Sequence, residues 1–356
     1  MAADVSERRD ALVERLRGST LGALDIVSVY IGVRLGLYRT LADRGPSSSA
    51  ELAEAAGLNE RYVREWLEQQ ATTGILDVDD ERHYSLPLGH DEALLDETSL
   101  NYIAPVGKLV VACVRPIDAV LAAFRSGDGV PYADYGADMH EGQAESSRPL
   151  FEHLLGSEWF PAIPDVHERL GADPSARVAD VACGQGYSTM AIARAYPKAR
   201  VDGIDLDAAS IAAARENLIG SGVEDRVTFH DRDAADPRLH GQYDLVYVHE
   251  ALHDMSYPVD ALRACRGLLG DGGCVVVADE RVADTFTGAG DDVERLCYGY
   301  SILTCLPVGM VGEGAAGTGT VMRAGTVRRY AEEAGFGGFE VLPIENDFFR
   351  FYRLTP

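Results

Sequence analysis

The spacing of apolar residues divides the chain into a helical first part and a second part in which strands and helices alternate. Apolar side chains recur at helical spacing over residues 21–42, and further helices are predicted over 99–125 and 141–170. From residue 176 onward, short apolar runs that end in glycine or an acid alternate with helical segments. This alternation is typical of a parallel sheet with crossover helices. The sequence therefore predicts an α/β domain preceded by a mainly α-helical one.

Within the first part, the pattern between residues 48 and 86 predicts a winged helix. Ser48 and Glu51 form a capping box for one short helix, Gly57 ends that helix, and Asn59 caps the next. Residues 74–86 read as two short strands around an acidic turn. Helix, turn, helix and hairpin in this order make a winged helix. We expect one side of the second helix to be buried through Tyr62, Val63, Trp66, Leu67 and Gln70.

The charge of this module argues against DNA as its partner. The helix that would enter a groove carries two arginines against three glutamates, and the hairpin turn is acidic. A DNA-binding surface needs a basic stripe to displace counterions from phosphate. The formal charge of the whole chain is -25, which also disfavours anionic membranes. We expect neither a nucleic acid nor a membrane as a partner.

The cysteines and the first residues of the chain indicate in which cellular compartment the protein is expected. The six cysteines show no spacing typical of a metal site, and several lie in apolar runs, as reduced core thiols do. The chain starts with polar and charged residues rather than a signal peptide. The most apolar stretch, 102–124, is interrupted by charges and is a candidate buried helix. These features favour a cytoplasmic protein.

The most informative motif begins in the apolar run 176–181. The run contains Asp180 and is followed by Gly184 and Gly186, and a helical segment begins directly afterwards. Glycines at such a turn let a ligand lie against the backbone at the helix N-terminus. A second strand ends in Asp205, about 20 residues later, where a carboxylate can accept both hydroxyls of a ribose. The third glycine of a dinucleotide fingerprint is missing, as is a Gly-Lys-Ser/Thr triplet, so neither a dinucleotide fold nor a P-loop is favoured.

With these motifs the chain resembles the class I S-adenosylmethionine-dependent methyltransferases. Asp180-Val-Ala-Cys-Gly-Gln-Gly186 matches the family's first motif, with Ala182 in place of its first glycine. Four further segments match in order over roughly residues 150–356: 203–207, 227–234, 243–248 and 269–273. The resemblance implies a Rossmann-like seven-stranded sheet with a terminal antiparallel hairpin. It also implies S-adenosylmethionine as cofactor, S-adenosylhomocysteine as product, and no metal.

Several residues are carried over from this resemblance as cofactor contacts. In the family the first motif holds the methionine end, the acid after the second strand holds the ribose, and the acid after the third holds the adenine. The contacts so implied are Asp180, Ala182, Gly184, Gly186, Tyr187, Asp205, Leu206, Asp233, Ala234 and His249. His249 is the least certain in kind, because a histidine in this strand either touches the cofactor or packs in the core.

The catalytic group is predicted just after the fourth strand, because ligands bind at the carboxyl ends of parallel strands. The segment 249–256 resembles the Leu-His-Asp-Trp motif of small-molecule O-methyltransferases, with His253 as general base and Asp254 after it. Glu280 stands where the family has an acid that flanks the histidine. An imidazole can take the proton of a hydroxyl near neutral pH, and a carboxylate can fix its tautomer. Catalytic roles are therefore assigned to His253, Asp254 and Glu280.

The acceptor pocket is predicted from an insert over 283–324, which joins an aromatic helix to a glycine-rich loop. Its pocket residues are Tyr300, Met310 and Arg323, together with Tyr135 from a loop before the α/β domain. Arg323 either holds an acidic acceptor or forms an ordinary salt bridge. The family's second flanking acid is absent at 318–325, so transfer to oxygen is favoured while N- and C-methylation stay open.

The predicted organisation has three parts. Residues 1–98 form a winged-helix dimerisation domain, 99–150 a helical linker that contributes to the substrate cleft, and 151–356 the methyltransferase domain. The expected partners are a small-molecule acceptor and a second copy of the chain. Two alternatives stand beside methyl transfer. One is a protein of the same fold that uses the sulfonium for decarboxylation, hydroxylation or rearrangement, and the other is a ligand-responsive winged-helix transcriptional regulator.

Overall fold

The computed structural model describes residues 2–288 and 290–356, so residue 1 of the predicted winged-helix domain and residue 289 of the predicted insert lie outside it. The chain divides into two compact units. One comprises Met1–Ala112 with Glu141–Pro149, and the other Cys113–His140 with Leu150–Pro356. The polypeptide therefore crosses between the units three times, and a segment predicted as linker contributes to both.

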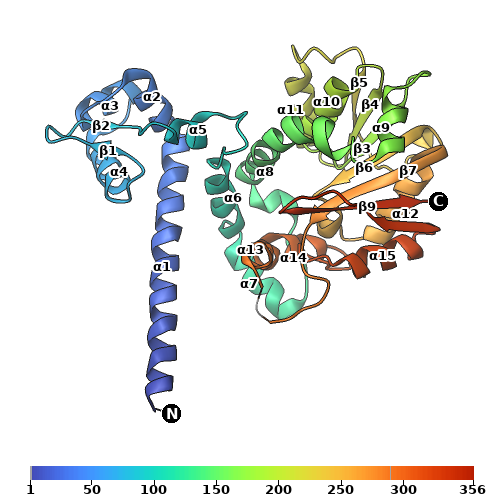
Figure 1. Cartoon of the computed structure of the whole chain (residues 1–356). Coiled ribbons are helices and arrows are strands. Elements are labelled where there is room, and N and C mark those ends of the chain that lie inside the picture. The colour runs from blue at the N-terminus through green and yellow to red at the C-terminus, as the bar shows by residue number, and fades with distance from the viewer. Residues whose placement is uncertain (1, 289) are drawn as a thin grey trace. The chain divides into compact units, whose positions relative to one another are not determined.

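The first unit is helical apart from one small hairpin (Figure 1). Its helices are α1 (Ala2–Arg34), α2 (Leu37–Arg44), α3 (Ser49–Ala56), α4 (Glu60–Thr72), α5 (His90–Leu95) and most of α6 (Pro105–Val114). The antiparallel hairpin pairs β1 (Asp77–Val78) with β2 (Tyr84–Ser85). Helix α8 (Ala137–Leu150) lies partly in this unit.

The helix ends of the winged helix are those that the sequence predicts. Ser48 and Glu51 form a reciprocal capping box at α3, Gly57 ends that helix in the left-handed conformation, and the side chain of Asn59 caps α4. Val63, Trp66, Leu67 and Gln70 are buried, as expected. The prediction for Tyr62 is wrong, since its side chain is 81% exposed. Tyr62 precedes the buried Val63 by one residue, and a helix turns that neighbour toward solvent.

The arginines of α4 are paired with the glutamates that surround them. Arg61 pairs with Glu65 and Arg64 with Glu60, each one turn apart. On the hairpin, Arg82 pairs with Glu68 of α4. The positive charges of this surface are thus matched locally, which leaves no basic stripe over these residues for phosphate.

Helix α1 exposes a row of large apolar side chains. Leu24 is 60% exposed and Ile31 41%, and both belong to the apolar positions from which the helix was predicted. The segment Asp4–Arg34 is long and apolar enough to cross a membrane. Core helices of soluble proteins and signal sequences can have the same length and composition. The helix stops before Gly36, which has a positive φ of 66°, and α2 follows with Leu37 and Leu41 buried.

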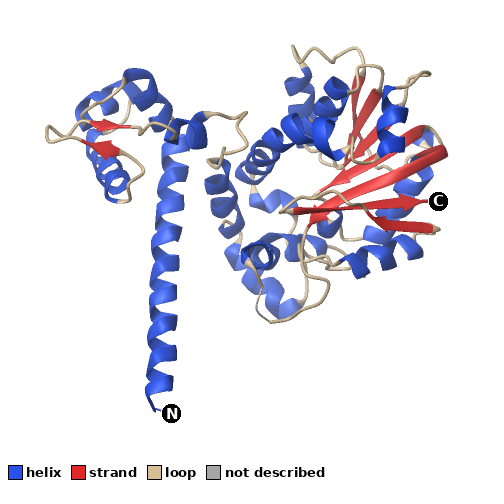
Figure 2. Ribbon diagram, viewed as in Figure 1, coloured by secondary structure: helices blue, strands red, loops and turns tan. Residues whose placement is uncertain are grey.

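The second unit is built on a seven-stranded sheet (Figure 2). The strand order is β5-β4-β3-β6-β7-β9-β8, with β9 antiparallel to both its neighbours and the other pairs parallel. The strands are β3 (Arg177–Val181), β4 (Arg200–Asp205), β5 (Val227–Asp231), β6 (Tyr243–His249), β7 (Leu269–Glu280), β8 (Gly338–Val341) and β9 (Phe349–Thr355). The predicted fold class, a Rossmann-like methyltransferase sheet with a terminal antiparallel hairpin, is confirmed.

Helices cover both faces of this sheet and create two apolar cores. One core joins the sheet to the π-helical segment η2 (Phe151–Trp159), α9 (Pro164–Gly171), α10 (Tyr187–Ala195) and α11 (Ala208–Leu218). The other joins it to α12 (Pro258–Leu268) and α15 (Ala324–Glu333). The remaining elements are α7 (Ile117–Ser126), α13 (Asp292–Tyr300), α14 (Leu306–Gly309), η5 (Ser301–Cys305) and the short turns η1 (Tyr132–Tyr135), η3 (Pro237–Leu239) and η4 (Leu252–Asp254). The order of the strands reverses between β3 and β6, which is where ligands bind in such sheets.

Candidate functional site

The turn after β3 has the backbone shape that its glycines predict. Gly184 and Gly186 have positive φ values of 52° and 81°, and Gly186 is the residue before α10. Ala182 also has a positive φ, of 60°. A residue with a Cβ is strained in that region, which explains why the family's motif has glycine where this chain has alanine.

The two glycines differ in what surrounds them. A Cβ on Gly186 would lie 2.3 Å from Cζ of the buried Phe229, whereas one on Gly184 would have no heavy atom within 4 Å. Gly186 is thus required by packing inside the fold. Gly184 presents bare backbone to open space above the turn.

This difference predicts opposite outcomes for two matched substitutions. Gly184→Ala should cost only the strain of a positive φ, about 1–2 kcal/mol of unfolding free energy, but should block a ligand lying on the turn. Gly186→Ala adds an overpacking cost of about 1–3 kcal/mol against Phe229. Urea unfolding and calorimetry with S-adenosylhomocysteine measure the two effects. Unimpaired binding by the folded Gly184→Ala protein would contradict the placement of the cofactor.

Asp205, at the end of β4, is tied to the glycine turn. Its Oδ2 accepts from the backbone N–H of Gly184 at 2.9 Å, and its Oδ1 accepts from that of Asp207 at 2.9 Å. Burial raises the pKa of Asp205 from 3.8, against the lowering effect of these hydrogen bonds. The next residue, Leu206, is apolar and yet 72% exposed. A mostly buried carboxylate beside an exposed apolar side chain suits a ribose next to a flat base.

The other predicted cofactor contacts lie around this turn. Asp180 is buried, and its Oδ2 accepts from the hydroxyls of Ser188 and Thr189, at 2.6 Å each. Burial raises the pKa of Asp180 to about 6. Its carboxylate therefore fastens the turn to the first residues of α10, a contact that the sequence did not reveal. Tyr187 opens α10 half-buried, Asp233 is exposed with Oδ1 on the N–H of Ala235 at 2.8 Å, and Ala234 is buried.

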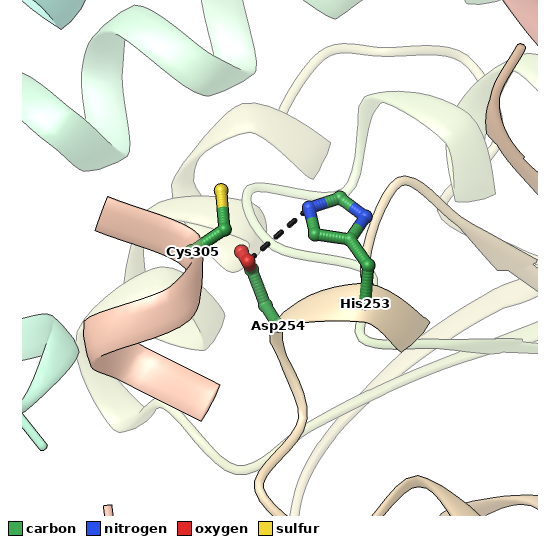
Figure 3. A group of neighbouring side chains, drawn as sticks. All are labelled: His253, Asp254 and Cys305. Atoms are coloured by element: carbon green, nitrogen blue, oxygen red, sulfur yellow. Dashed lines mark ion pairs between the residues drawn. The ribbon is translucent and has the colours of Figure 1, made fainter. Parts of the chain in front are cut away.

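The predicted catalytic residues come together around one imidazole. Nδ1 of His253, on η4, lies 2.8 Å from Oδ1 of Asp279 and 3.1 Å from Oε2 of Glu280, both at the end of β7. Nε2 lies 3.1 Å from Oδ1 of Asp254, as Figure 3 shows. The side chains of Asp279 and Glu280 are 0% and 4% exposed, against 29% for Asp254. The His253 ring is itself buried, and its Nε2 faces the most exposed of these three carboxylates.

The charges of this cluster are set by burial and by mutual contact. Burial alone would lower the pKa of His253, but Glu280, Asp279 and Asp254 outweigh it and hold that pKa well above 6.5. Burial raises the pKa of Glu280 well above 4.5. Burial acts in the same direction on Asp279, yet His253 and the hydrogen bonds lower its pKa below 3.8. Of the two carboxyl groups at Nδ1, Asp279 is thus the more acidic and Glu280 the more readily protonated.

Asp279 is a site residue that the sequence analysis missed. It makes the hydrogen bond to Nδ1, the role expected of Glu280, and also accepts from the N–H of Glu280 at 3.1 Å. The alternation of β7 contained the signal. Val275 and Val277 belong to the core shared with Leu252 of η4, so Asp279, two residues further, points to the same face. Glu280 reaches the imidazole from the opposite face only because the strand ends there.

A cysteine lies on the open side of the same cluster. His253, Asp254 and Cys305 of η5, drawn in Figure 3, each place one potential metal-ligand atom within 4.8 Å of the others. The same holds for His253, Asp279 and Glu280. Burial raises the pKa of the Cys305 thiol, so it stays protonated near neutral pH. The contacts of the cluster are those of an imidazolium among carboxylates, and they explain the geometry without a metal.

His249, the predicted contact of uncertain kind, packs in the core instead of joining the carboxylates. Its ring stacks on Trp159 at a centroid distance of 5.6 Å and lies 4.6–4.7 Å from the rings of Phe349 and Phe151. Nδ1 lies 2.7 Å from the hydroxyl oxygen of Tyr247. Burial lowers the pKa of His249 to about 3, so the ring is neutral. It carries no charge toward a ligand.

The predicted pocket residues lie in or against the insert. Tyr135 is buried and its hydroxyl donates to the carbonyl of Leu303 at 2.8 Å, while Tyr300 and Met310 are half-buried. Arg323 donates to Oε1 of the buried Glu294 at 2.8 Å and to the carbonyl of Ala283, so its guanidinium is already occupied. The glycine-rich loop is fastened to η4, because the N–H of Gly319 donates to the carbonyl of His253 at 3.2 Å.

Two family models match the chain, each over part of its length. Residues 179–275 match a methyltransferase domain, and residues 23–96 match an Rv2258c-like winged helix-turn-helix domain. Among curated relatives, the mitomycin biosynthesis 6-O-methyltransferase of Streptomyces lavendulae is 25% identical over 259 residues, which are 69% of this chain and 70% of that protein. The ubiquinone biosynthesis O-methyltransferase of Marinobacter nauticus is 36% identical over 104 residues, 29% of this chain and 43% of that one. An uncharacterized Synechococcus protein is 35% identical over 98 residues, 27% of this chain, and the match spans only 24% of its own length.

Solved structures share the fold over almost the whole chain. The mitomycin 7-O-methyltransferase MmcR has a TM-score of 0.71 at 17% identity, covering 99% of this chain and 100% of that one. PigF, solved with S-adenosylhomocysteine, has a TM-score of 0.72 at 18% identity, with 96% and 99% coverage. Human N-acetylserotonin methyltransferase, solved with S-adenosylmethionine, has a TM-score of 0.70 at 15% identity, with 97% coverage of both chains. With the glycine turn, Asp205 and the seven-stranded order already in place, these matches identify a methyltransferase domain over residues 179–275 and a winged helix over residues 23–96, on a fold shared with O-methyltransferases.

Proposed function

We propose that this protein transfers the methyl group of S-adenosylmethionine to a hydroxyl oxygen of a small molecule. The observation that carries the proposal is His253, held at Nδ1 by Asp279 and facing the partly exposed Asp254 with Nε2, at the carboxyl edge of the sheet that also carries the glycine turn. A histidine fixed in this way is suited to accept a hydroxyl proton.

The residues around the turn fit the cofactor. Gly184 exposes backbone, Asp205 offers a carboxylate with lone pairs to spare, and Leu206 supplies an uncovered apolar surface. We assign the cofactor contacts to Asp180, Gly184, Gly186, Asp205 and Asp233, with Asp180 acting through the shape of the turn. Bound there, S-adenosylmethionine supplies an electrophilic methyl group on a sulfonium. The protein's own contribution is to hold the acceptor oxygen in line and to take its proton.

The protonation of His253 sets a condition on this role. Because its pKa is raised, the imidazole of the ligand-free protein is mostly cationic near neutral pH. The neutral form is then rarer but a stronger base, so the proton of the acceptor is accepted more readily as the pH rises. Oδ1 of Asp254 lies 3.1 Å from Nε2 of His253, so an acceptor hydroxyl that approaches Nε2 would also meet this carboxylate.

We further propose that two copies of the chain pair through the N-terminal unit. The exposed apolar row of α1 supports this, since such a face is costly to leave in water. The matched charges on α4 and the hairpin support a small-molecule enzyme in the cytoplasm rather than a DNA-binding regulator. A monomer's mass in light scattering would contradict the pairing.

Product analysis tests methyl transfer against the other chemistries of this fold. The full chain is incubated with S-adenosylmethionine and a panel of phenols, with amines and activated carbon acids as comparison acceptors. We expect S-adenosylhomocysteine and an O-methylated phenol in equal amounts, measured by mass spectrometry. Conversion of an acceptor without S-adenosylhomocysteine would contradict the proposal and favour sulfonium-assisted decarboxylation, hydroxylation or rearrangement.

A further inference from the structure

The turn η1 is fixed to the segment that carries Cys305. The N–H of Val130, just before the turn, donates to the carbonyl of Pro307 at 2.9 Å. The hydroxyl of Tyr135, at its end, donates to the carbonyl of Leu303 at 2.8 Å. Both acceptors flank Cys305, which lies beside His253 and Asp254. The turn is therefore held next to the candidate base from both ends.

A chain of contacts leads from the same turn to the candidate ribose acid. The ring of Tyr132 lies 4.7 Å from the ring of His140, centroid to centroid, at an angle of 58°. Nδ1 of His140 lies 3.3 Å from Oδ2 of Asp207 and 3.3 Å from Oγ of Ser210. The N–H of Asp207 in turn donates to Oδ1 of Asp205 at 2.9 Å. Tyr132 thus lies in a turn that is hydrogen-bonded to the insert, and its ring contacts a histidine that reaches the loop after β4.

The contacts of η1 on both sides place Tyr132 between the two ends of the site. Burial raises its pKa, and the negative charges of Asp254, Asp205 and Asp207 raise it further. Carboxylates from the acceptor end and from the ribose end therefore act on one phenol, which stays protonated. Within residues 2–288 and 290–356 that hydroxyl makes no hydrogen bond, whereas the hydroxyl of Tyr135 is taken by Leu303.

We propose that Tyr132 contacts the sulfonium group of bound S-adenosylmethionine, with its ring or hydroxyl oxygen facing the positive charge between Asp205 and Asp254. This inference rests on the proposed function. The electron-rich face of a tyrosine attracts a cation, and more strongly where water is excluded. The surrounding carboxylates favour the same positive charge. Tyr132 would accordingly discriminate the charged cofactor from its neutral product.

The discrimination gives a test that needs no knowledge of the acceptor. Calorimetry on the full chain measures Kd for S-adenosylmethionine and for S-adenosylhomocysteine. We expect Tyr132→Leu, which keeps an apolar side chain but removes ring and hydroxyl, to weaken S-adenosylmethionine about tenfold and S-adenosylhomocysteine far less. Tyr132→Phe separates the two contacts: affinity near that of the unchanged protein assigns the contact to the ring, and affinity like that of Tyr132→Leu assigns it to the hydroxyl.

A matched control lies outside the site, at the C-cap of α10. Tyr196→Phe removes a hydroxyl whose oxygen lies 2.8 Å from Nδ1 of His167 and should leave the ratio of the two Kd values unchanged. Equal weakening of both ligands in Tyr132→Leu would show a merely structural role and overturn the inference. Absence of binding by the unsubstituted chain would instead overturn the proposed function, so the two failures are distinguishable.

Discussion

Replacing His253 by alanine is expected to lower the rate of methyl transfer by about 10²–10⁴-fold, the range usual for loss of a positioned general base. The loss should appear in turnover, because the ring contacts Asp279, Glu280 and Asp254 and none of the residues of the glycine turn. Formation of S-adenosylhomocysteine measures the rate, and calorimetry checks that the cofactor still binds. Methylation at an undiminished rate would remove His253 from the mechanism.

A histidine outside the site serves as the matched control for this substitution. His167 on α9 is exposed, and its Nδ1 lies 2.8 Å from the hydroxyl oxygen of Tyr196. His167→Ala therefore removes an imidazole with a similar local bond but without carboxylate neighbours. It should leave turnover unchanged, and a comparable loss in both variants would point to general destabilisation.

The pH profile of the unsubstituted protein reports on the same residue. Because the folded-state pKa of His253 is raised, the base is neutral only at higher pH, and kcat/KM should climb through a limb well above pH 6.5. Asp279→Asn should lower the rate and move this limb to lower pH, since the charged partner of Nδ1 is lost. Glu280→Gln should do less, because burial raises the pKa of Glu280 and because the hydrogen bond to Nδ1 is made by Asp279. A limb at or below pH 6.5 in the unsubstituted protein would contradict this assignment of charges.

Asp205→Ala is expected to weaken S-adenosylhomocysteine binding by at least about 100-fold. Hydrogen bonds to a charged group contribute about 1.5–3 kcal/mol each, and this carboxylate is placed to accept two from a ribose. The substitution also frees the N–H groups of Gly184 and Asp207, which loosens the turn. Calorimetry gives the Kd, and thermal unfolding shows how much of the loss is structural.

Asp225→Ala is the control for this effect. Asp225 precedes β5, its side chain is 77% exposed, and it pairs with the neighbouring Arg226. Exposed pairs of this kind contribute little, so neither stability nor cofactor affinity should change. Unaltered binding by Asp205→Ala would show that the acid after β4 does not hold the ribose.

The local features of the chain were predictable because short stretches of sequence determine them. The capping box at Ser48, the positive φ of Gly184 and Gly186, and the strand that ends in Asp205 each depend on a few neighbouring residues. The order of the apolar runs then fixed the sheet, since parallel strands joined by helices have few ways to wind. His253 was likewise found from its place directly after the fourth of these strands.

Contacts between residues far apart in the chain were decided only by the tertiary structure. Asp279 rather than Glu280 bonds to Nδ1 of His253, because the face of β7 that packs against η4 was not known beforehand. Among the residues that the structure describes, the hydroxyl of Tyr132 has no hydrogen-bond partner, whereas that of Tyr135 donates to the carbonyl of Leu303, 168 residues away. The guanidinium of Arg323 likewise donates a hydrogen bond to Glu294, which is distant in sequence. By itself the sequence determined the fold and the residue types of the site, since periodicity and turn chemistry act locally. Partners and protonation depend on burial and on charges from other strands, which exist only once the chain has folded.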